Sequence, residues 1–403
     1  MQKIIILGGG AAGFFAAIIC AEHNPNTEII ILERGSKVLQ KVKVSGGGRC
    51  NVTHACFIPN ELIEFYPRGK KELLGPFHQF MTGDTMQWFE ERGVPLKIEA
   101  DNRVFPQSNT SQSIIDVLTN EVQKNNIKIK LNHRVEDIQK ENKTWKITTN
   151  AGNFIADKLL IASGSNTKAW ELISTLGHTI IPPVPSLFTF KINDVRIKEI
   201  PGISVPNATV SLIDSKFESN GSLLITHWGI SGPAVLKLSA FGALFLAEKN
   251  YQYSVKVNWL SKPLSTVLNK LKILKKENPK KQLILKSVFK DIPKRLWEQL
   301  VLASEIKPAQ RWADISNKHL DNLANQLTNT IFNAYGKTTF KEEFVTAGGI
   351  DLKEINFKRF ESKIHNNLFF AGEVLNIDAV TGGFNFQNAW TGGYIAGKNM
   401  SHR

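Results

Sequence analysis

The first 34 residues contain the pattern that most restricts how this chain can fold. The stretch "KIIILGGGAAGFFAAIICAEHNPNTEIIILER", residues 3–34, places a short β-branched strand before a glycine turn, then a helix of small residues, a turn and a second strand. Two strands joined through a helix predict a βαβ unit, whose strands lie parallel in one sheet. The expected fold class is therefore α/β.

Three glycines lie at the turn between the first strand and the helix. Gly8, Gly10 and Gly13 form the pattern G-x-G-x-x-G, and Glu33 ends the second strand, twenty residues after Gly13. In a dinucleotide site these glycines permit the tight turn, the approach of a pyrophosphate and close helix–strand packing, while the acid binds a ribose diol. The free N–H groups at the helix start attract phosphate. A purely structural glycine turn is the alternative, but the strand, helix and acid in register favour dinucleotide contacts at Gly8, Gly10, Ala11, Ala12, Gly13, Glu33 and Arg34.

The C-terminal segment favours FAD over NAD. Residues 368–397, "LFFAGEVLNIDAVTGGFNFQNAWTGGYIAG", are similar to the closing element of flavoproteins with two dinucleotide folds, and Glu373 stands where their acid meets the ribityl chain. A helix expected to begin near Gln387 would point its N-terminus at the flavin pyrimidine edge, where a reduced flavin is negative. The loop in "LLIASGS", 159–165, and the strand at Val135 also resemble dinucleotide-contacting parts of these proteins. We predict non-covalent FAD, with further contacts from Val135, Ala162, Ser163, Gly164, Gly372, Glu373, Gly383, Phe384, Asn385 and Gln387.

Together with other segments, these motifs resemble one family. The chain is similar to bacterial flavoproteins usually labelled NAD(P)/FAD-dependent oxidoreductases, whose members have been named aminoacetone oxidase or linked to bile-acid dehydroxylation. The resemblance spans nearly the whole chain and implies a Rossmann-like FAD-binding domain of the glutathione-reductase-like superfamily, interrupted by a β-rich domain and a helical subdomain. Two departures affect nearby polar contacts: His54 replaces the usual asparagine after "RCNVT", and Asn376 replaces the usual aspartate of "GEVLD". The resemblance is carried by "SGGGRCN" (45–51), "RVFP" (103–106), "PPVPSL" (182–187), "THWGISGPAVLKLS" (226–239), "VTAGGI" (345–350) and "FAGEVLNIDAVTGGFNFQNAWTGGYIAG" (370–397).

The pattern of expected elements indicates where these domains begin and end. Three prolines at 182–185 indicate a crossing between domains, and the strand–glycine signature of the first domain returns near Asn367. The predicted parts are an FAD-binding domain at 1–188 and 341–403, a β-rich insert at 189–260 and 305–340, and a lysine-rich helical subdomain at 261–304. Helical periodicity predicts helices near Gln79–Glu91, Ser111–Lys124, Leu264–Lys276, Leu283–Phe289, Pro293–Ser304 and Leu320–Thr330.

The segment "KVSGGGRCNVTHAC", residues 43–56, has several interpretations. In this superfamily the chain after the ribose acid runs beneath the cofactor, so the resemblance implies an FAD-lining segment; a plain turn is the alternative. Its glycines let backbone N–H groups approach phosphate or flavin oxygens, and Arg49 can add positive charge. A redox disulfide between Cys50 and Cys56 is disfavoured, because their spacing exceeds that of related disulfide reductases by one residue and no second G-x-G-x-x-G follows. Cys50, His54 and Cys56 lack a fourth ligand nearby, so we predict no metal site. The expected lining residues are Ser45, Gly46, Gly47, Arg49, Cys50 and Asn51.

No residue has a firm predicted catalytic role. His227, in "THWGISGP", can donate a proton near neutral pH, although a hydrogen-bonded structural histidine is the commoner case. Arg103 can hold a substrate anion or form a structural salt bridge. Cys50 can act beside the flavin or simply pack as a small hydrophobic residue. Because the flavin carries the electrons, the protein mainly supplies orientation and electrostatics.

Composition limits the class of protein and its partners. No apolar run reaches eighteen residues, and three cysteines in 403 residues make no disulfide framework, so we expect a soluble cytoplasmic protein without membrane contact. The net charge of +14 is uneven, since Lys262–Arg295 holds eleven basic residues against two acidic ones. A solvated helix face is the usual explanation of such a segment, and an anionic partner is the alternative.

These observations predict an FAD-dependent oxidoreductase. It would transfer a hydride equivalent between a small organic substrate, or NAD(P)H, and flavin N5. Without a second nucleotide-binding fold, NAD(P)H would bind transiently over the flavin, or the electrons would go to oxygen. Two alternatives stay open: a flavoprotein that binds or modifies RNA through the basic segment, and a non-enzymatic flavin sensor. The substrate and the oligomeric state are left open.

Overall fold

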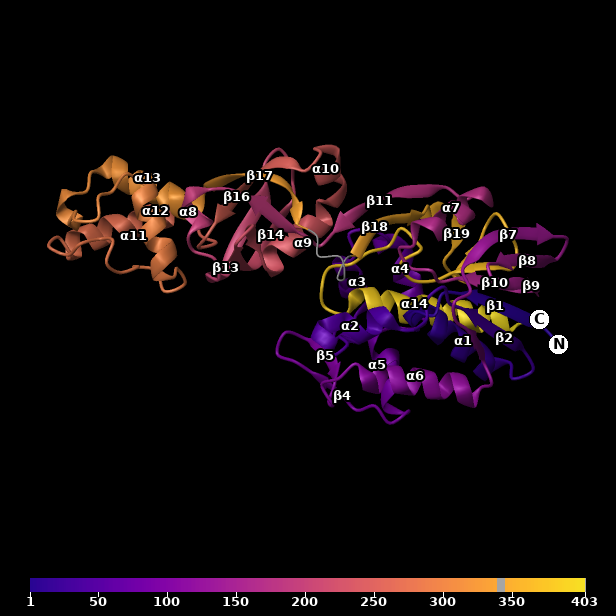
Figure 1. Cartoon of the computed structure of the whole chain (residues 1–403). Helices are drawn as coiled ribbons and strands as arrows, with labels where there is room; N and C mark the ends of the chain where they lie inside the picture. Colours follow the sequence, from indigo (N-terminus) through magenta and orange to yellow (C-terminus); the bar gives the residue numbers. More distant parts are fainter. Residues whose placement is uncertain (339–344, 403) are drawn as a thin grey trace. The chain divides into compact units, whose positions relative to one another are not determined.

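The protein forms two compact units (Figure 1), seen in a computed structural model that describes residues 1–338 and 345–402. Unit 1 comprises Met1–Val184 and Val345–Arg403, and unit 2 comprises Pro185–Phe344. The first predicted domain crossing, at 188–189, lies close to the boundary at 184–185. The second predicted boundary, at 340–341, lies outside the described residues.

A seven-stranded sheet forms the centre of unit 1, in the order β19-β20-β21-β10-β1-β2-β6. β1 pairs in parallel with β2 and β10, and β21 from the C-terminal part of the chain pairs in parallel with β10. Four of the five residues of β1 are buried, as expected for a parallel strand covered on both faces. This sheet confirms the predicted Rossmann-like α/β fold. Its strands are β1 Lys3–Leu7, β2 Glu28–Leu32, β6 Lys128–Lys130, β10 Lys158–Ile161, β19 Ile355–Asn356, β20 Glu361–Ser362 and β21 Leu368–Phe370.

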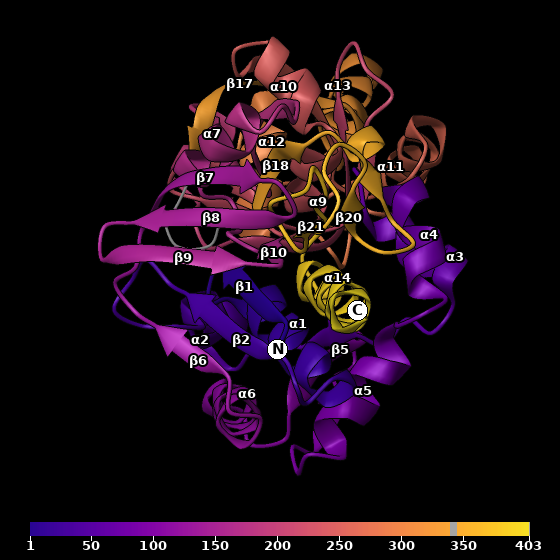
Figure 2. The ribbon, with the colours of Figure 1, turned by 90° about the vertical axis from the view of Figure 1, so that its right-hand side faces the viewer.

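The first and last helices of the chain pack against each other. α1 (Ala11–His23) and α14 (Phe384–Ser401) lie side by side in Figure 2 and share an extensive contact. A Cβ atom on Gly393 would lie 2.9 Å from the carbonyl oxygen of Ala12, and one on Gly397 would lie 2.5 Å from that of Ala16. Glycine at these two positions therefore lets the two backbones approach.

Smaller sheets and helices complete unit 1. β11 contains the three prolines that predicted a crossing, and it forms a two-stranded sheet with β18, where few N–H groups are needed. The helices predicted near 79–91 and 111–124 correspond to α5 and α6. The strands are β3 Thr53–His54, β4 Leu96–Ile98, β5 Arg103–Pro106, β7 Val135–Glu141, β8 Thr144–Thr149, β9 Gly152–Ala156, β11 Ile180–Ser186 and β18 Val345–Ile350. The helices are α2 Gln40–Gly48, α3 Pro59–Leu62, α4 Lys70–Phe77, α5 Thr82–Glu90, α6 Gln112–Lys124 and α7 Thr167–Thr175, with 3-10 turns at Ile63–Phe65 and Leu352–Glu354.

Unit 2 contains a closed β-barrel, with helices in the connections between its strands. The barrel order is β12-β15-β14-β13-β16-β17, and antiparallel pairing of β12 with β17 closes it. The strands are β12 Thr189–Ile192, β13 Ser204–Leu212, β14 Glu218–Thr226, β15 Gly229–Ser231, β16 Gln252–Asn258 and β17 Thr330–Thr338. The helices are α8 Val195–Lys198, α9 Pro233–Phe241, α10 Ala243–Glu248, α11 Leu264–Glu277, α12 Lys294–Ala303 and α13 Asn317–Thr328, with a 3-10 turn at Trp312–Asp314.

The helical part of unit 2 differs from the prediction in two ways. It continues beyond 304, because α13 packs on α11 and α12, and one hydrophobic cluster joins these helices to the barrel. The predicted helix Leu283–Phe289 is wrong, since this segment is irregular. The backbone of Leu283 instead accepts a hydrogen bond from Trp297 Nε1 at 3.1 Å, and the hydroxyl of Ser287 bonds locally to Phe289. Across the described ranges no helix has both the length and the apolar composition to cross a membrane.

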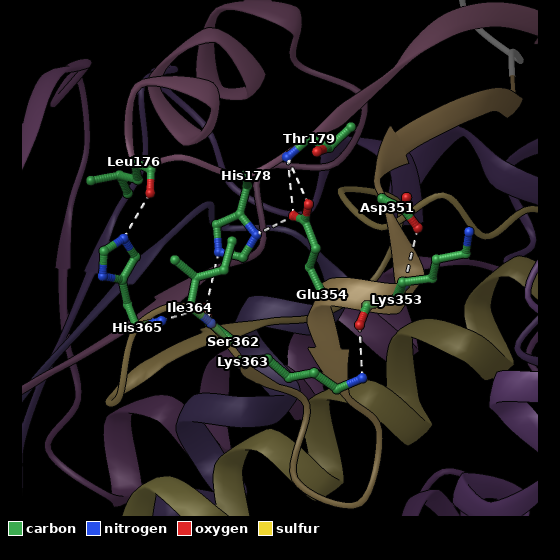
Figure 3. A network of polar contacts seen from close by, with 10 residues as sticks. All are labelled: Leu176, His178, Thr179, Asp351, Lys353, Glu354, Ser362, Lys363, Ile364 and His365. Carbon is green, nitrogen blue, oxygen red and sulfur yellow. Dashed lines mark hydrogen bonds and ion pairs between the residues drawn. The ribbon is translucent and has the colours of Figure 1, made fainter.

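A buried polar network holds the segment after α7 in unit 1 (Figure 3). His178 Nδ1 lies 2.8 Å from Glu354 Oε2, and its Nε2 lies 2.9 Å from Ser362 Oγ. Serine, histidine and carboxylate in this order resemble a hydrolytic triad. The Ser362 hydroxyl is buried, however, and already accepts hydrogen bonds from the backbone N–H groups of Ile364 and His365. The network is therefore a structural connection between α7, the 3-10 turn at 352–354 and β20.

This network predicts a pH-dependent stability. Burial lowers the pKa of His178 and outweighs the opposing effect of Glu354. As the pH falls below about 6.5, the usual histidine pKa, the unfolded chain gains a proton that folded His178 does not, so the free energy of unfolding decreases. His178→Gln should cost about 1–3 kcal/mol at neutral pH and flatten this decrease, measured by denaturant unfolding at several pH values. The exposed control His78→Gln should leave the slope unchanged; equal slopes for all three proteins would contradict the assignment.

Candidate functional site

The glycine turn between β1 and α1 has the geometry that its spacing predicts. Gly8 has a positive φ of 112°, and a Cβ atom there would lie 2.4 Å from the carbonyl oxygen of Ala162. A Cβ atom on Gly13 would lie 2.1 Å from the Gly8 oxygen, whereas one on Gly10 would meet nothing within 4 Å. Packing thus requires two of the glycines, and open space lies at the third. Ala11 and Ala12 begin α1 without a side-chain cap, which leaves their N–H groups for a ligand.

Glu33 follows β2 and lies beside this turn. Its Oε2 accepts a hydrogen bond from Gly9 N at 2.9 Å, and its Oε1 accepts one from Gly35 N at 2.7 Å. These bonds fix the carboxylate at the edge of a cavity of about 380 Å³. Five predicted contact residues line this cavity together: Gly8, Glu33, Arg34, Val135 and Ser163. The sequence did not indicate its other polar lining residues, among them His133, Arg134, Asn166 and Lys168.

The loop after β10 contains Ala162, Ser163 and Gly164, the three residues predicted there to contact the dinucleotide. Ala162 N donates to Leu7 O at 2.8 Å, which holds the loop against the end of β1. Gly164 has a φ of 60°, and its carbonyl oxygen accepts a hydrogen bond from Trp170 Nε1. The Ser163 hydroxyl is buried and has no hydrogen-bond partner within the described residues. An unpaired hydroxyl beside a cavity suggests that a ligand supplies its partner.

A dinucleotide fits these residues. Gly10 leaves room for a pyrophosphate at the start of α1, Glu33 can accept hydrogen bonds from a ribose diol, and the buried Ser163 hydroxyl has no partner in the described part of the chain. When bound, FAD supplies a two-electron carrier that accepts and returns a hydride equivalent. No group of three or more His, Cys, Asp or Glu side chains in the described part of the chain is arranged to hold a metal ion.

The second expected contact region is the start of α14. This helix begins at Phe384 rather than near Gln387, because Gly383 in the left-handed region (φ 94°) serves as its N-cap. A Cβ atom on Gly383 would lie 2.5 Å from the carbonyl oxygen of Thr53. Asn385 exchanges two hydrogen bonds with the backbone of Ala379. Gln387 is fully buried and forms hydrogen bonds with the hydroxyl groups of Thr53, Thr85 and Thr391. The side chains of Asn385 and Gln387 therefore support the start of the helix.

Gly372 and Glu373 follow β21. Gly372 has a φ of 78°, and a Cβ atom there would lie 3.1 Å from the Cβ of Ala12 in α1. Glu373 accepts a hydrogen bond from Thr346 N at 3.2 Å and forms an ion pair with Lys41. Sequence reasoning missed Lys41, because nothing in its spacing indicates that it meets Glu373. Asn376, the departure noted above, accepts a hydrogen bond from Gly348 N at 3.1 Å.

The glycine-rich segment 45–51 begins inside α2, where Ser45, Gly46 and Gly47 form a kink. Gly46, Gly47 and Gly48 have φ values of 57°, 68° and 83°. All three are in the left-handed region, which residues with a side chain adopt only at a cost in free energy. Cβ atoms on Gly47 and Gly48 would meet nothing within 4 Å. Ser45 donates its hydroxyl to Val42 O, and the buried Asn51 Oδ1 has no partner among the described residues. The open backbone and the unpaired amide oxygen are compatible with the predicted cofactor lining.

Arg49 and Arg103 belong to one charge cluster on the neighbouring three-stranded sheet. Arg49 Nη1 lies 2.6 Å from Glu99 Oε1, and its guanidinium lies 3.9 Å from the centre of the Phe105 ring. Arg103 Nε donates to Asp101 at 2.7 Å, and its Nη2 lies 3.5 Å from Glu99. Carboxylates therefore neutralise both guanidinium groups. This geometry supports structural roles better than the phosphate and substrate contacts predicted for them.

His54, which replaces the family's usual asparagine, and the catalytic candidate His227 lie in different places. The His54 ring is tilted against Phe384, with ring centres 4.5 Å apart, and its Nδ1 lies 3.3 Å from Gly382 O, beside the start of α14. Burial lowers the pKa of His54. His227 is exposed in the turn between β14 and β15 of unit 2, so its proposed role as proton donor stays a prediction.

Cys50 is completely buried and has a positive φ of 59°. Burial raises the pKa of its thiol to about 12, with a smaller opposing effect from Ser45. Cys56 is also buried, and neither forms a disulfide. A thiol of this kind stays protonated near neutral pH, which favours the packing interpretation over a reactive one.

We therefore expect Cys50 to be unreactive in the folded protein. Iodoacetamide at pH 8 should modify it only after denaturation, as followed by mass spectrometry of the peptide that contains it. Cys50→Ser should keep the FAD content unchanged and lower the free energy of unfolding by about 1–3 kcal/mol, because a hydroxyl is costlier to bury. Rapid native labelling, or loss of flavin from a folded Ser variant, would show that the thiol acts at the site.

Comparisons with known proteins identify relatives along the whole chain. The chain is 29% identical to the 3-dehydro-bile acid delta(4,6)-reductase of Clostridium scindens, covering 100% of both chains. It is also 29% identical to the ribosomal RNA dihydrouridine synthase of Haemophilus influenzae, covering 99% of this chain and 98% of that protein. The 3-ketosteroid-delta4-(5alpha)-dehydrogenase of Rhodococcus jostii RHA1 has a similar fold, with a TM-score of 0.55 over 100% of this chain and 97% of that one, at 11% identity.

A family model identifies the chain as a whole. The model described as the HI0933-like protein Rossmann domain matches residues 2–399, which includes both units. The match and these relatives confirm the resemblance, the FAD cofactor and the oxidoreductase class that the sequence predicts. The chain belongs to the HI0933-like Rossmann-domain family and is an FAD-dependent oxidoreductase.

Proposed function

We propose that this enzyme reduces a carbon–carbon double bond conjugated with a carbonyl group. The observation that carries the proposal is the full-length similarity to two reductases of such bonds. One relative is named for a 3-oxo bile acid with double bonds at positions 4 and 6, and the other for the formation of dihydrouridine. In both substrates the carbonyl withdraws electrons from the double bond, so that a hydride equivalent adds to the far carbon and a proton to the near one.

The residues of unit 1 suit this chemistry. The start of α1 and Glu33 hold the dinucleotide. The left-handed Gly383 begins α14, and the N-terminus of this helix can stabilise negative charge that develops nearby. Cβ atoms on Gly47 and Gly48 would meet nothing within 4 Å, so the backbone of this segment borders open space. Three free, buried cysteines are compatible with the reducing cytoplasm that the sequence predicts.

The electrons are proposed to come from NAD(P)H or a small organic donor. The sequence contains one G-x-G-x-x-G, which the FAD site uses, so a nicotinamide would bind transiently and not in a second fold. A non-enzymatic sensor is distinguished by a flavin that no donor bleaches.

Anaerobic titration of the purified protein tests this proposal. NADH or NADPH should bleach the flavin absorbance band, and an α,β-unsaturated ketone or uridine-containing RNA should restore it. The saturated ketone and an isolated alkene are the controls, and they should leave the band bleached because nothing activates their carbon atoms. A purified protein without flavin, or a reduced flavin that only oxygen reoxidises, would overturn the proposal.

A second candidate is a substrate carried on RNA, favoured by the basic helices of unit 2. Lys275 bonds to Ile315 O and Lys294 lies 3.7 Å from Glu298, but most basic residues of Lys262–Arg295 are exposed and have no carboxylate within 4 Å among the described residues. Such a surface attracts phosphate. The uracil C5=C6 bond is conjugated with a carbonyl. A second ribosomal RNA dihydrouridine synthase, that of Escherichia coli, is 26% identical to this chain over 98% of this chain and 97% of its own length.

RNA binding at several salt concentrations tests the second candidate. Replacing Lys272, Lys276 and Lys280 by Gln should weaken RNA binding at least tenfold and lower the salt slope by about one per lost phosphate contact. The matched control replaces Lys143, Lys216 and Lys358, which are exposed elsewhere, and should change little. Both variants should be reduced by NAD(P)H at the wild-type rate. Equal RNA affinity of the two variants, or no retention at low salt, would favour a free small-molecule substrate.

A further inference from the structure

Lys41 connects three segments that meet at the dinucleotide site. It lies near the start of α2, its ammonium group forms an ion pair with Glu373, and its Nζ lies 3.3 Å from Ser165 Oγ. A Cβ atom placed on Gly164 would lie 3.7 Å from Glu373 Oε2 and 4.0 Å from Lys41 Nζ. The loops that hold Ser165 and Glu373 follow the adjacent parallel strands β10 and β21. Ligands of open α/β sheets bind at these carboxyl ends of strands.

The start of α2 is also fixed to the glycine turn. Leu39, the N-cap of α2, adopts a left-handed conformation with a φ of 55°, and its N–H donates to Gly9 O at 2.8 Å. A Cβ atom on Gly9 would lie 2.7 Å from a methyl group of Val38. Lys41 is two residues beyond this attachment. The lysine is therefore held near the turn where the first and second glycines shape a pyrophosphate site.

The ion pair that Lys41 makes is replaceable. Its side chain is 62% exposed and that of Glu373 is 20% exposed, so solvent screens their attraction. Exposed pairs of this kind contribute little to stability, and a pyrophosphate with two negative charges offers the same ammonium group a stronger, charge-assisted contact. Arg49 is engaged by Glu99 and Phe105, which leaves the cation expected for the phosphates to another residue.

We propose that Lys41 is a cofactor-binding residue, whose ammonium group exchanges Glu373 for the pyrophosphate of FAD. The exchange frees the Glu373 carboxylate to accept hydrogen bonds from hydroxyl groups of the cofactor. Before the cofactor binds, the pair keeps the two charges neutral beside the Gly164 loop. This inference rests on the FAD-dependent activity described above, and it concerns how the cofactor is held, not which substrate is reduced.

A double-mutant cycle of Lys41→Met and Glu373→Gln tests this exchange. The dissociation constant for FAD is measured by quenching of its fluorescence with flavin-free protein. Lys41→Met should raise the constant about 10- to 100-fold and reduce its dependence on salt, because a charge-assisted phosphate contact is lost. The same loss should appear when Glu373 is already Gln, and Lys41→Arg should bind FAD nearly as well as wild type.

Matched controls separate the possible outcomes. Lys43→Met removes an exposed charge of the same helix two residues away and should leave the dissociation constant unchanged. Thermal unfolding of the flavin-free variants establishes that each is folded. An unchanged constant for Lys41→Met, or a loss that disappears in the Glu373→Gln background, would overturn the proposal and leave Lys41 as a counterion of Glu373. A wild-type protein that binds no FAD would instead overturn the FAD-dependent activity.

Discussion

The contact between α1 and α14 is the interaction on which the site depends. It brings the last helix of the chain against the first, and glycines at 393 and 397 allow the helix backbones to approach each other. Because of this contact, the start of α14 at Gly383 and the loop of Glu373 after β21 belong to the same unit as the glycine turn at residues 8–13. The central sheet is completed in the same way, since β21 pairs with β10. A long insertion between β11 and β18 is therefore compatible with one continuous cofactor site.

The parts that the sequence predicts well are those fixed by local geometry. The G-x-G-x-x-G spacing specifies a turn in which Gly8 and Gly13 cannot carry a side chain, and Glu33 follows because β2 ends there. The parts that it misses depend on distant partners. Lys41 meets Glu373 only in the folded chain, and Arg49 turns to Glu99, fifty residues later. The helix α14 begins at Phe384, earlier than the predicted start near Gln387, because Gly383 adopts a left-handed conformation and serves as its N-cap.

Residue type alone was a poor guide to reactivity in this chain. Cys50 lies in the glycine-rich segment, yet its thiol is buried and its pKa is raised to about 12. Ser362, His178 and Glu354 are bonded in the order of a hydrolytic triad, yet the serine oxygen is already occupied by two backbone N–H groups. Conversely, the exposed and weakly held Lys41 is the better candidate for a functional role. Accessibility and unused bonding capacity separate functional groups from structural ones more reliably than their identity.

Chemistry and substrate choice are divided between the two units in our proposal. Unit 1 contains the groups that hold the cofactor, and these suit any acceptor with a carbonyl-conjugated double bond. Relatives named for a bile acid and for ribosomal RNA are both 29% identical to this chain, so sequence identity does not separate the two substrate classes. The segment Lys262–Arg295 of unit 2 carries nine of the fourteen net positive charges, which suits a polyanion such as RNA better than a bile acid with one carboxylate. We infer that this segment, and not the cofactor site, would recognise an anionic substrate.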